Sequence, residues 1–504
     1  MLRYIRLLRL AIGGLCFLGL TGTFIGLRTF NLPAYQFFPA LLAVHAVVIA
    51  AILAVTFVVG RVYCSTLCPL GIFQDIVWWF AKKTTKRARA MTYMPEKACL
   101  RYGVLMITFL SMAAGGALVL NVIEPYSLFG RMASALLLPI YNGVYNQLAL
   151  WGLTQGWWQW FPDESAWLGI EALVGGAVSF GVMAVLSFRW GRLYCQTICP
   201  VGTMLGTVSR FSLFQPTFVT DQCIRCRRCE RACRSQCIDV TNQSVDTSRC
   251  VMCLDCIAVC PKDAMQMKSH LPRITVPAKE QADADPDCLM SRRDMLIRSG
   301  VALTTACIAI AKDSLPVEAA MDDAATYGDV MPPGAMSFTN FTQRCTACHR
   351  CVDNCPSGVL QPAVISYGGA GLWQPRLDFT KGYCVYTCAG CSHRCPTGAI
   401  KPLRLQDKQV LQIGKAVYYP TQCLVHTKGY SCGICARHCP TQAIDMVPQA
   451  DGTIEPHVRH SKCIGCGSCE YHCPVPQKAI AVKTMRVQKP LGTSKGKHVS
   501  NKTS

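Results

Sequence analysis

The sequence predicts an α-helical membrane bundle joined to small α+β domains that are organised around clusters of cysteine. Three observations support this fold class: four long apolar stretches, 33 cysteines among 504 residues, and a regular spacing of most of these cysteines. Hydrophobic residues make up 51% of the chain and charged residues 16%, which is too apolar for a disordered protein. The chain is also too long for a secreted mini-domain held together by disulfides. We therefore expect metal–thiolate sites attached to a membrane domain.

Each apolar stretch is close to the roughly 20 residues that a helix needs to cross a bilayer. The segment 61–101 contains eight Lys or Arg, whereas the segment 124–166 contains only Arg131. By the positive-inside rule, the N-terminus and 61–101 are cytoplasmic and 124–166 is an outer loop. Five tryptophans predict an aromatic belt at the outer interface, namely Trp151, Trp157, Trp158, Trp160 and Trp167. The four predicted spans are 7–27, 38–59, 103–123 and 167–188.

A segment of twelve residues occurs twice in the membrane half, at 60–71 and 191–202, with eight identical positions. Each copy follows a predicted span and contains the pattern C-x3-C-P. Cysteines four apart share one face of a helix, so the two pairs can meet across the repeat. We predict a redox-active thiol pair or a four-thiolate metal site, and the alternative is a structural turn with buried thiols. The four cysteines are Cys64, Cys68, Cys195 and Cys199.

Six further groups of cysteines follow or vary the spacing C-x2-C-x2-C-x3-C. A cubane iron–sulfur cluster needs four converging thiolates, and in two-cluster ferredoxins the last cysteine of each run binds the other run's cluster. Zinc sites use C-x2-C pairs rather than repeated quartets. The spacing therefore predicts ferredoxin-like iron–sulfur domains of the α+β class, with about six [4Fe–4S] clusters.

The first two runs directly follow the fourth predicted span. Arg234, rather than proline, follows Cys233, and Cys237 lies four residues after Cys233 as an alternative ligand. The regular spacing favours Cys233. Crossed pairing predicts one cluster on Cys223, Cys226, Cys229 and Cys260, and a second on Cys250, Cys253, Cys256 and Cys233.

Four more runs lie in the second half of the chain, and two of them have a longer first spacing. Pairing of neighbouring runs is the simpler arrangement, and nesting of the first run with the last is the alternative. Ala-Ile pairs at 399–400, 443–444 and 479–480 predict short strands over the clusters. The first run also matches the haem pattern C-x2-C-H, but its complete ferredoxin spacing argues against haem. The runs are Cys345, Cys348, Cys351 and Cys355; Cys384, Cys388, Cys391 and Cys395; Cys423, Cys432, Cys435 and Cys439; and Cys463, Cys466, Cys469 and Cys473.

Two arginines, Arg292 and Arg293, precede a short apolar stretch at 295–311. They resemble a twin-arginine export signal or the positive flank of a fifth membrane helix, and both interpretations place 316–504 in the periplasm. A buried cytoplasmic helix is the third interpretation. The predicted segments are a four-span membrane domain at 1–215, a two-cluster domain at 216–270, a linker at 271–290 (216–290 being cytoplasmic), the signal or fifth helix at 291–315, a linker at 316–337, a four-cluster domain at 338–485 and a basic tail at 486–504.

The first 270 residues resemble the NapH-type membrane subunit of periplasmic nitrate-reductase systems, with four spans, two C-x3-C-P motifs and a two-cluster ferredoxin. Residues 288–485 resemble its partner, the NapG/MauM-type exported ferredoxin with four clusters. The resemblance implies a fusion of both proteins in a bacterial inner membrane, acting in anaerobic respiration. It also implies a quinol dehydrogenase that takes electrons from the quinol pool, menaquinol for example, to a periplasmic reductase or cytochrome. His45 and Glu124 are the candidate quinone contacts, and Asp75 is a further candidate proton acceptor.

Several other functions lack the motifs that they require. The sequence has no dinucleotide fingerprint, P-loop or hydrolytic triad, and we predict no flavin and no haem. The net charge of +21 comes without a nucleic-acid-binding motif, so no nucleic-acid partner is predicted. Two alternatives to quinol oxidation stay open. One is an assembly factor or a metal-reducing factor, for copper for example, that serves a respiratory enzyme, and the other is a redox sensor.

Overall fold

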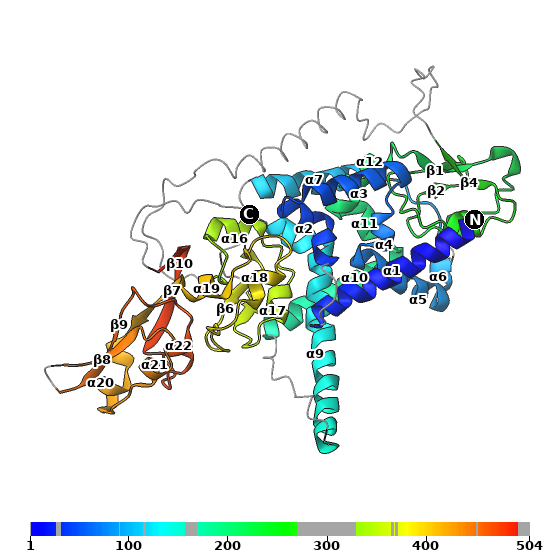
Figure 1. Ribbon diagram of the computed structural model, residues 1–504. Coiled ribbons are helices and arrows are strands. Elements are labelled where there is room, and N and C mark those ends of the chain that lie inside the picture. Colours follow the sequence, from blue (N-terminus) through cyan, green and yellow to red (C-terminus); the bar gives the residue numbers. More distant parts are fainter. Residues whose placement is uncertain are drawn as a thin grey trace. The chain divides into compact units, whose positions relative to one another are not determined.

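The computed structural model describes residues 2–26, 32–89, 91–113, 117–156, 169–269, 329–363, 367, 371–449 and 452–491. The chain forms two compact units (Figure 1). The first consists of Met1–Ala133 and Gly176–Val317, and the second of Ser134–Gly175 and Glu318–Ser504. The predicted signal or fifth helix at 291–315 and the linker at 271–290 lie outside the described residues.

Two of the four predicted spans are long apolar helices. They are α1 (Leu2–Phe24) and α10 (Ile170–Trp190), and within the described residues these two have the length and composition to cross a membrane. The second stretch is divided into α2 (Phe37–Leu42) and α3 (Ala46–Val59), because Val44 has φ 59° and ends the first helix. The third consists of α7 (Ala98–Ala113) and α8 (Leu118–Ile123). Among the described residues two of the predicted spans are thus helices of membrane length, and the four-span bundle stays a prediction.

Much of the segment 124–166, the predicted outer loop, is helical. Helix α9 (Pro125–Thr154) has 30 residues and includes Pro139. Trp151 lies on α9 and is 55% exposed, whereas the other tryptophans of the predicted belt lie outside the described residues.

Each C-x3-C-P motif joins two helices and does not lie within one. Helix α4 (Tyr63–Thr66) is followed by α5 (Pro69–Thr84), and α11 (Leu193–Thr197) by α12 (Pro200–Ser209). The second cysteine is the N-cap of the following helix and proline is its first residue, where the missing N–H has no consequence. The expected single helical face for both cysteines is thus wrong, because the cap residue has an extended backbone.

The two-run domain follows α12 and has the α+β character that its spacing predicts. Strands β1 (Phe214–Phe218) and β4 (Met265–Ser269) pair antiparallel, as do β2 (Ile238–Asp239) and β3 (Ser244–Val245). The short helices α13 (Arg228–Ala232) and α14 (Asp255–Ala258) each begin within a cysteine run. A small core that includes Cys229, Cys233 and Ile238 fills the space between them.

The four-run domain repeats this plan within the second unit. Its antiparallel pairs are β5 with β6, β7 with β10, and β8 with β9. Strands β8 and β10 begin at Ile444 and Ile480, where Ala-Ile pairs predicted strands. The ordered domain extends beyond 338–485, because Val330 bridges to Leu377 and β10 continues to Pro490. The strands are β5 (Leu360–Pro362), β6 (Pro375–Leu377), β7 (Leu411–Tyr418), β8 (Ile444–Pro448), β9 (Ile454–Val458) and β10 (Ile480–Pro490), and the helices are α16 (Phe338–Arg344), α17 (Arg350–Asp353), α18 (Gly390–Arg394), α19 (Leu405–Gln409), α20 (Leu424–Lys428), α21 (Ile434–Arg437) and α22 (Ser468–Tyr471).

Candidate iron–sulfur and thiol sites

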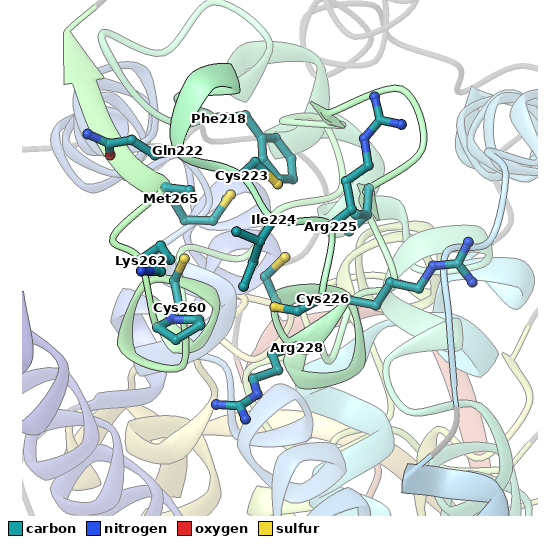
Figure 2. Close-up of a pocket in the computed structure, with 15 residues that line it drawn as sticks. Phe218, Gln222, Cys223, Ile224, Arg225, Cys226, Arg228, Cys260, Lys262 and Met265 are labelled. Carbon is teal, nitrogen blue, oxygen red and sulfur yellow. The ribbon is translucent and has the colours of Figure 1, made fainter.

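The first predicted ligand set converges on a pocket of the two-run domain. This pocket is lined by set I, which is Cys223, Cys226, Cys229 and Cys260. Figure 2 shows the labelled cysteines gathered around this space, whereas the guanidinium groups of the exposed Arg225 and Arg228 point away from it. The folded chain therefore brings three thiols of the first run together with the last thiol of the second.

The second set lines a separate pocket of the same domain. Set II is Cys233, Cys250, Cys253 and Cys256. The alternative ligand, Cys237, is 1% exposed, and its sulfur lies 3.6 Å from the sulfur of Cys233. Of these two cysteines, Cys233 is the one that lines the pocket. Cys237 thus has a position from which its thiol can form a hydrogen bond with a member of the set.

The four runs of the second unit also cross between neighbours rather than nest. Cys345 and Cys351 of set III lie in one buried core with Cys395 packed against it, and sets IV, V and VI each line a pocket. The longer first spacings still deliver Cys384 and Cys423 to their pockets. The sets are Cys345, Cys348, Cys351 and Cys395 (III); Cys355, Cys384, Cys388 and Cys391 (IV); Cys423, Cys432, Cys435 and Cys473 (V); and Cys439, Cys463, Cys466 and Cys469 (VI).

Four of the six runs share an unusual backbone feature that we did not predict. On both sides of the second cysteine, the residues have φ between 51° and 78°. Two of these runs contain Arg225 with Arg227, and Gly465 with Gly467. A left-handed backbone costs a residue with a side chain about 1–2 kcal/mol, whereas glycine adopts it freely. The feature belongs to the regular spacing, because the described residues beside Cys388 and Cys432 lack it. The other two pairs are Met252 with Leu254, and Ala347 with His349.

The haem-like pattern has a different environment from a haem site. His349 is 2% exposed, and its Nε2 lies 3.0 Å from the backbone oxygen of Trp373. Cys345 and Cys348, the two cysteines of the pattern, lie with set III. The histidine therefore takes part in backbone packing beside set III.

The four cysteines of the C-x3-C-P repeat come together in the first unit, where each is at most 4% exposed. Three of the four sulfur atoms accept N–H hydrogen bonds. Cys199 accepts from the amide of Gly202 at 3.3 Å, Cys195 from Gln74 Nε2 at 3.2 Å and Cys64 from Arg61 Nη2 at 3.8 Å. Cys68, the N-cap of α5, makes no such bond to the first turn of its helix. Burial raises the pKa of the Cys195 thiol to about 11, so the free thiol is neutral at neutral pH.

Two arginines at equivalent positions of the repeat cross between its copies. Arg61 Nη2 donates to the backbone oxygen of Cys195 at 3.2 Å, and Arg192 Nη1 donates to that of Cys64 at 2.8 Å. Both side chains are fully buried. A side chain at Gly71 or Gly202 would collide with the same cysteine carbonyls, so glycine permits the close approach of the following helix. The two copies therefore form one site with approximate two-fold symmetry.

A buried ion network joins this site to set II. Asp75 pairs with Arg192 at 2.7 Å and with Arg234 at 2.6 Å, and Arg234 also pairs with Asp255 at 2.8 Å. Arg234 follows Cys233, and Asp255 precedes Cys256. Burial disfavours the charge of Asp75, but its two arginines hold the pKa of that carboxyl below its ordinary value. Sequence reasoning missed this network, because its members are far apart along the chain.

The two candidate quinone contacts have different environments. His45 is exposed at the start of α3, immediately after the break in the second apolar stretch. Glu124 is 1% exposed and accepts N–H bonds from Tyr126 and Ser127 at the start of α9. Burial raises the pKa of its carboxyl. No described contact joins His45 to Glu124. Within the described residues, no three or more His, Cys, Asp or Glu side chains converge closely enough to hold a single metal ion.

Three protein-family models match parts of the chain. One described as a 4Fe-4S binding domain matches residues 41–87 and 172–217, which contain both copies of the C-x3-C-P repeat. A second 4Fe-4S binding domain matches 244–266, and a 4Fe-4S dicluster domain matches 430–476. The models thus fall on both the doublets and the ferredoxin runs.

Curated relatives are similar over less than half of the chain. An uncharacterized protein of Methanocaldococcus jannaschii is 27% identical over 44% of this chain and 69% of its own length. The putative electron transport protein YccM of Escherichia coli is 24% identical over 44% of this chain and 55% of its own length. The ferredoxin-type protein NapH of Escherichia coli is 25% identical over 42% of this chain and 62% of its own length. The chain thus spans less than two thirds of YccM and NapH. No solved structure matches it.

The cysteine sets, the matching models and the named relatives agree on the general chemistry. The chain is an iron–sulfur protein of the electron-transfer class, related to ferredoxin-type proteins. It contains several 4Fe-4S binding domains and two helices long and apolar enough to cross a membrane.

Proposed function

We propose that this protein is a multi-pass protein of the bacterial inner membrane that oxidises a quinol, such as menaquinol, and passes the electrons through six [4Fe–4S] clusters to a periplasmic reductase or cytochrome. The observation that supports it most is the convergence of sets I to VI, three crossed pairs in one chain with membrane-length helices. Such a chain has both parts that an electron route from a membrane donor requires.

The residues around the sets fit an iron–sulfur cofactor. When bound, each cluster would supply one-electron redox chemistry at a potential that hydrogen bonds to its sulfurs adjust. The chain provides such bonds: the amides of Gly390, Ile400 and Ala443 donate to Cys388, Cys395 and Cys439 at 3.4, 3.4 and 3.2 Å. Two of these amides, those of Ile400 and Ala443, belong to the Ala-Ile pairs, and the pair at 443–444 also leads into strand β8.

Contacts within the second unit support a periplasmic location for the four-run domain. The hydroxyl of Ser134 donates to Asp353 at 2.6 Å, and the amide of Gly169 donates to Gln361 Oε1 at 2.9 Å. Ser134 belongs to the segment 124–166, which has a single basic residue and is therefore expected outside. We propose that the four-run domain is the fused NapG/MauM-type part and docks on this side.

A quinol site needs a group near the bilayer that takes a proton. We propose His45 for this role, because its ring is exposed beside an interrupted apolar stretch. Glu124 is the second candidate, and its carboxylate would have to give up its hydrogen bonds to the amides of α9 to act. The two candidates make different predictions for single substitutions.

The decisive experiment uses full-length protein purified without oxygen into lipid discs. A menaquinol analogue is added, and the visible absorbance of the iron–sulfur centres is followed. Bleaching by the analogue supports quinol oxidation, and we expect H45A to slow it at least tenfold while H457A, at an exposed histidine of β9, leaves it unchanged. If dithionite alone bleaches the centres, the quinol proposal fails and an assembly or metal-reducing role takes its place.

The side of the four-run domain is tested with a compartment-sensitive reporter. The fusion point should follow Leu491, because β10 continues to Pro490 and an earlier fusion would cut its pairing with β7. Activity in the periplasm is the expected result. A reporter that is active only in the cytoplasm contradicts the proposed topology.

A further inference from the structure

The C-x3-C-P site contains a buried positive charge for which the described residues supply no carboxylate. Arg61 is fully buried, and its Nη1 donates to the backbone oxygen of Ser248 at 2.9 Å. Its other acceptors are the Cys195 carbonyl and the Cys64 sulfur, and its Nε has no hydrogen-bond partner. An unpaired ion in a protein interior costs several kcal/mol, even after relaxation. The site is therefore built for an anion that the polypeptide itself does not provide.

The equivalent arginine of the other copy of the repeat has the carboxylate partner that Arg61 lacks. Arg192 has the same position in its copy, but it makes two bonds to Asp75, each 2.7 Å long. The residue of the second copy that corresponds to Asp75 is Gly206. One of the two symmetric arginines is thus neutralised by a carboxylate, and the other reaches the Cys64 sulfur and the Cys195 carbonyl.

The surroundings of the thiols favour their ionised form bound to a metal. Three of the four sulfurs accept an N–H, and hydrogen bonds of this kind stabilise a thiolate. Metal binding replaces the thiol protons, so a bound metal centre brings thiolate charge to the site. A disulfide or a pair of thiols is neutral and would leave Arg61 without a counter-charge.

We propose that Cys64, Cys68, Cys195 and Cys199 hold a seventh iron–sulfur cluster, of the [4Fe–4S] type, whose negative charge compensates the buried Arg61. The 4Fe-4S binding domain model that covers both copies of the repeat is consistent with this assignment. The proposal goes beyond the proposed function, which requires only sets I to VI, and it holds whether or not a quinol is the donor.

The seventh site is the neighbour of set II in the fold. Arg61 reaches Ser248, two residues before Cys250, and Arg192 shares Asp75 with Arg234, which follows Cys233. The site therefore connects the helices that carry the C-x3-C-P motifs to the first cluster domain.

Thiol accessibility distinguishes the three possible states of the four cysteines. Three samples of full-length protein are denatured in the presence of a maleimide: one untreated, one after iron chelation, and one after chelation and reduction. The labelled fraction of each cysteine is then quantified by mass spectrometry. We expect the four cysteines to be protected from the maleimide until iron is chelated, and to be labelled after chelation without a reductant. Labelling only after reduction would indicate a disulfide, and labelling by denaturation alone would indicate free thiols; either result overturns the proposal. Cys16 of α1, outside every motif, is the internal control and should label in all three samples.

Iron content gives an independent measurement. We expect the C64S/C195S double variant to contain about four fewer iron atoms and four fewer sulfides per chain than wild type, measured against amino-acid analysis. The C16S variant should match wild type. Equal iron in C64S/C195S and wild type, with intact set II spectra, contradicts the seventh cluster. A failed quinol assay with normal iron loss in C64S/C195S would reject the proposed donor but leave the seventh cluster standing.

Discussion

The two copies of the C-x3-C-P repeat have the same local fold but different charges. In both, a short helix ends two residues before a cysteine that caps the next helix, and an arginine crosses to the partner copy. They differ three and four residues after the shared glycine, where the first copy has Gln74 and Asp75 and the second has Leu205 and Gly206. The two copies are thus alike in the residues that position the thiols, and they differ in the residues that contact the region of set II.

This difference shows what each copy contributes. The first copy supplies the carboxylate that connects Arg192 to Arg234 and the amide that bonds to Cys195. The second copy supplies space, because a side chain at Gly206 would collide with the guanidinium of Arg101 and the carbonyl of Ser248. Four tests of this division of roles follow, ordered by expected effect.

The strongest test removes the carboxylate that only the first copy has. D75N leaves Arg192 in the interior without a counter-ion and Arg234 with Asp255 alone, and breaking a buried pair in this way costs about 3–5 kcal/mol. Denaturant unfolding of anaerobic protein measures the loss of stability. D407N removes an exposed carboxylate paired with Arg404 and is the matched control, which should leave the unfolding midpoint unchanged. Equal stability of D75N and wild type would mean that the network is dispensable.

The second test fills the space that only the second copy has. G206A places a methyl group against Arg101 and Ser248, and overpacking of this kind costs about 1–3 kcal/mol. G103A in α7 is the control, because a methyl group there meets no atom within 4 Å. The control should be neutral or slightly stabilising, since alanine is the better helix former. If both variants behave alike, the close approach of the Ser248 loop has no energetic consequence.

The third test compares the two tyrosines that precede the first cysteine of each copy. The Tyr63 hydroxyl donates to Gln36 at 2.9 Å and accepts from the amide of Phe37 at 3.0 Å, whereas the Tyr194 hydroxyl donates to the carbonyl of Ile123. Y63F leaves two buried partners unsatisfied and should cost about 1–3 kcal/mol. Y194F, which leaves one, should cost less. The same unfolding assay ranks the two variants. A larger loss of stability in Y194F than in Y63F would contradict the prediction that the Tyr63 hydroxyl contributes more.

The smallest effect on stability is expected at Gln74. Q74L makes the first copy match the second and removes the N–H bond to the Cys195 sulfur. The Gln74 oxygen is buried without a partner, so stability should change by less than about 1 kcal/mol. A cluster at these cysteines should become harder to reduce, because a bond that favours the more negative state is lost. A potentiometric titration with Q215L as control measures this, and an unchanged potential would separate Gln74 from the redox centre.

Local patterns in the sequence predicted the parts of the molecule that local chemistry determines. The cysteine spacing indicated crossed sets, and two of the three Ala-Ile pairs indicated strands correctly, because both depend on residues within a few positions of each other. The pair at 399–400 lies in a bend instead. The contacts of Asp75 could not be predicted, since its partners Arg192 and Arg234 lie far along the chain and meet it only after folding.

The left-handed residues beside the second cysteine suggest how the loops respond when they lose their metal. In three of the four regular runs these residues have side chains, so the left-handed backbone of each such loop has a conformational cost that cluster binding offsets. The run with Gly465 and Gly467 has no such cost, because glycine adopts the left-handed backbone freely. When oxidation damages the clusters, the loops at Cys226, Cys253 and Cys348 should therefore lose their conformation first, and this loss promotes further release of metal. The loop at Cys466 should keep its conformation, so that a cluster can be inserted there again.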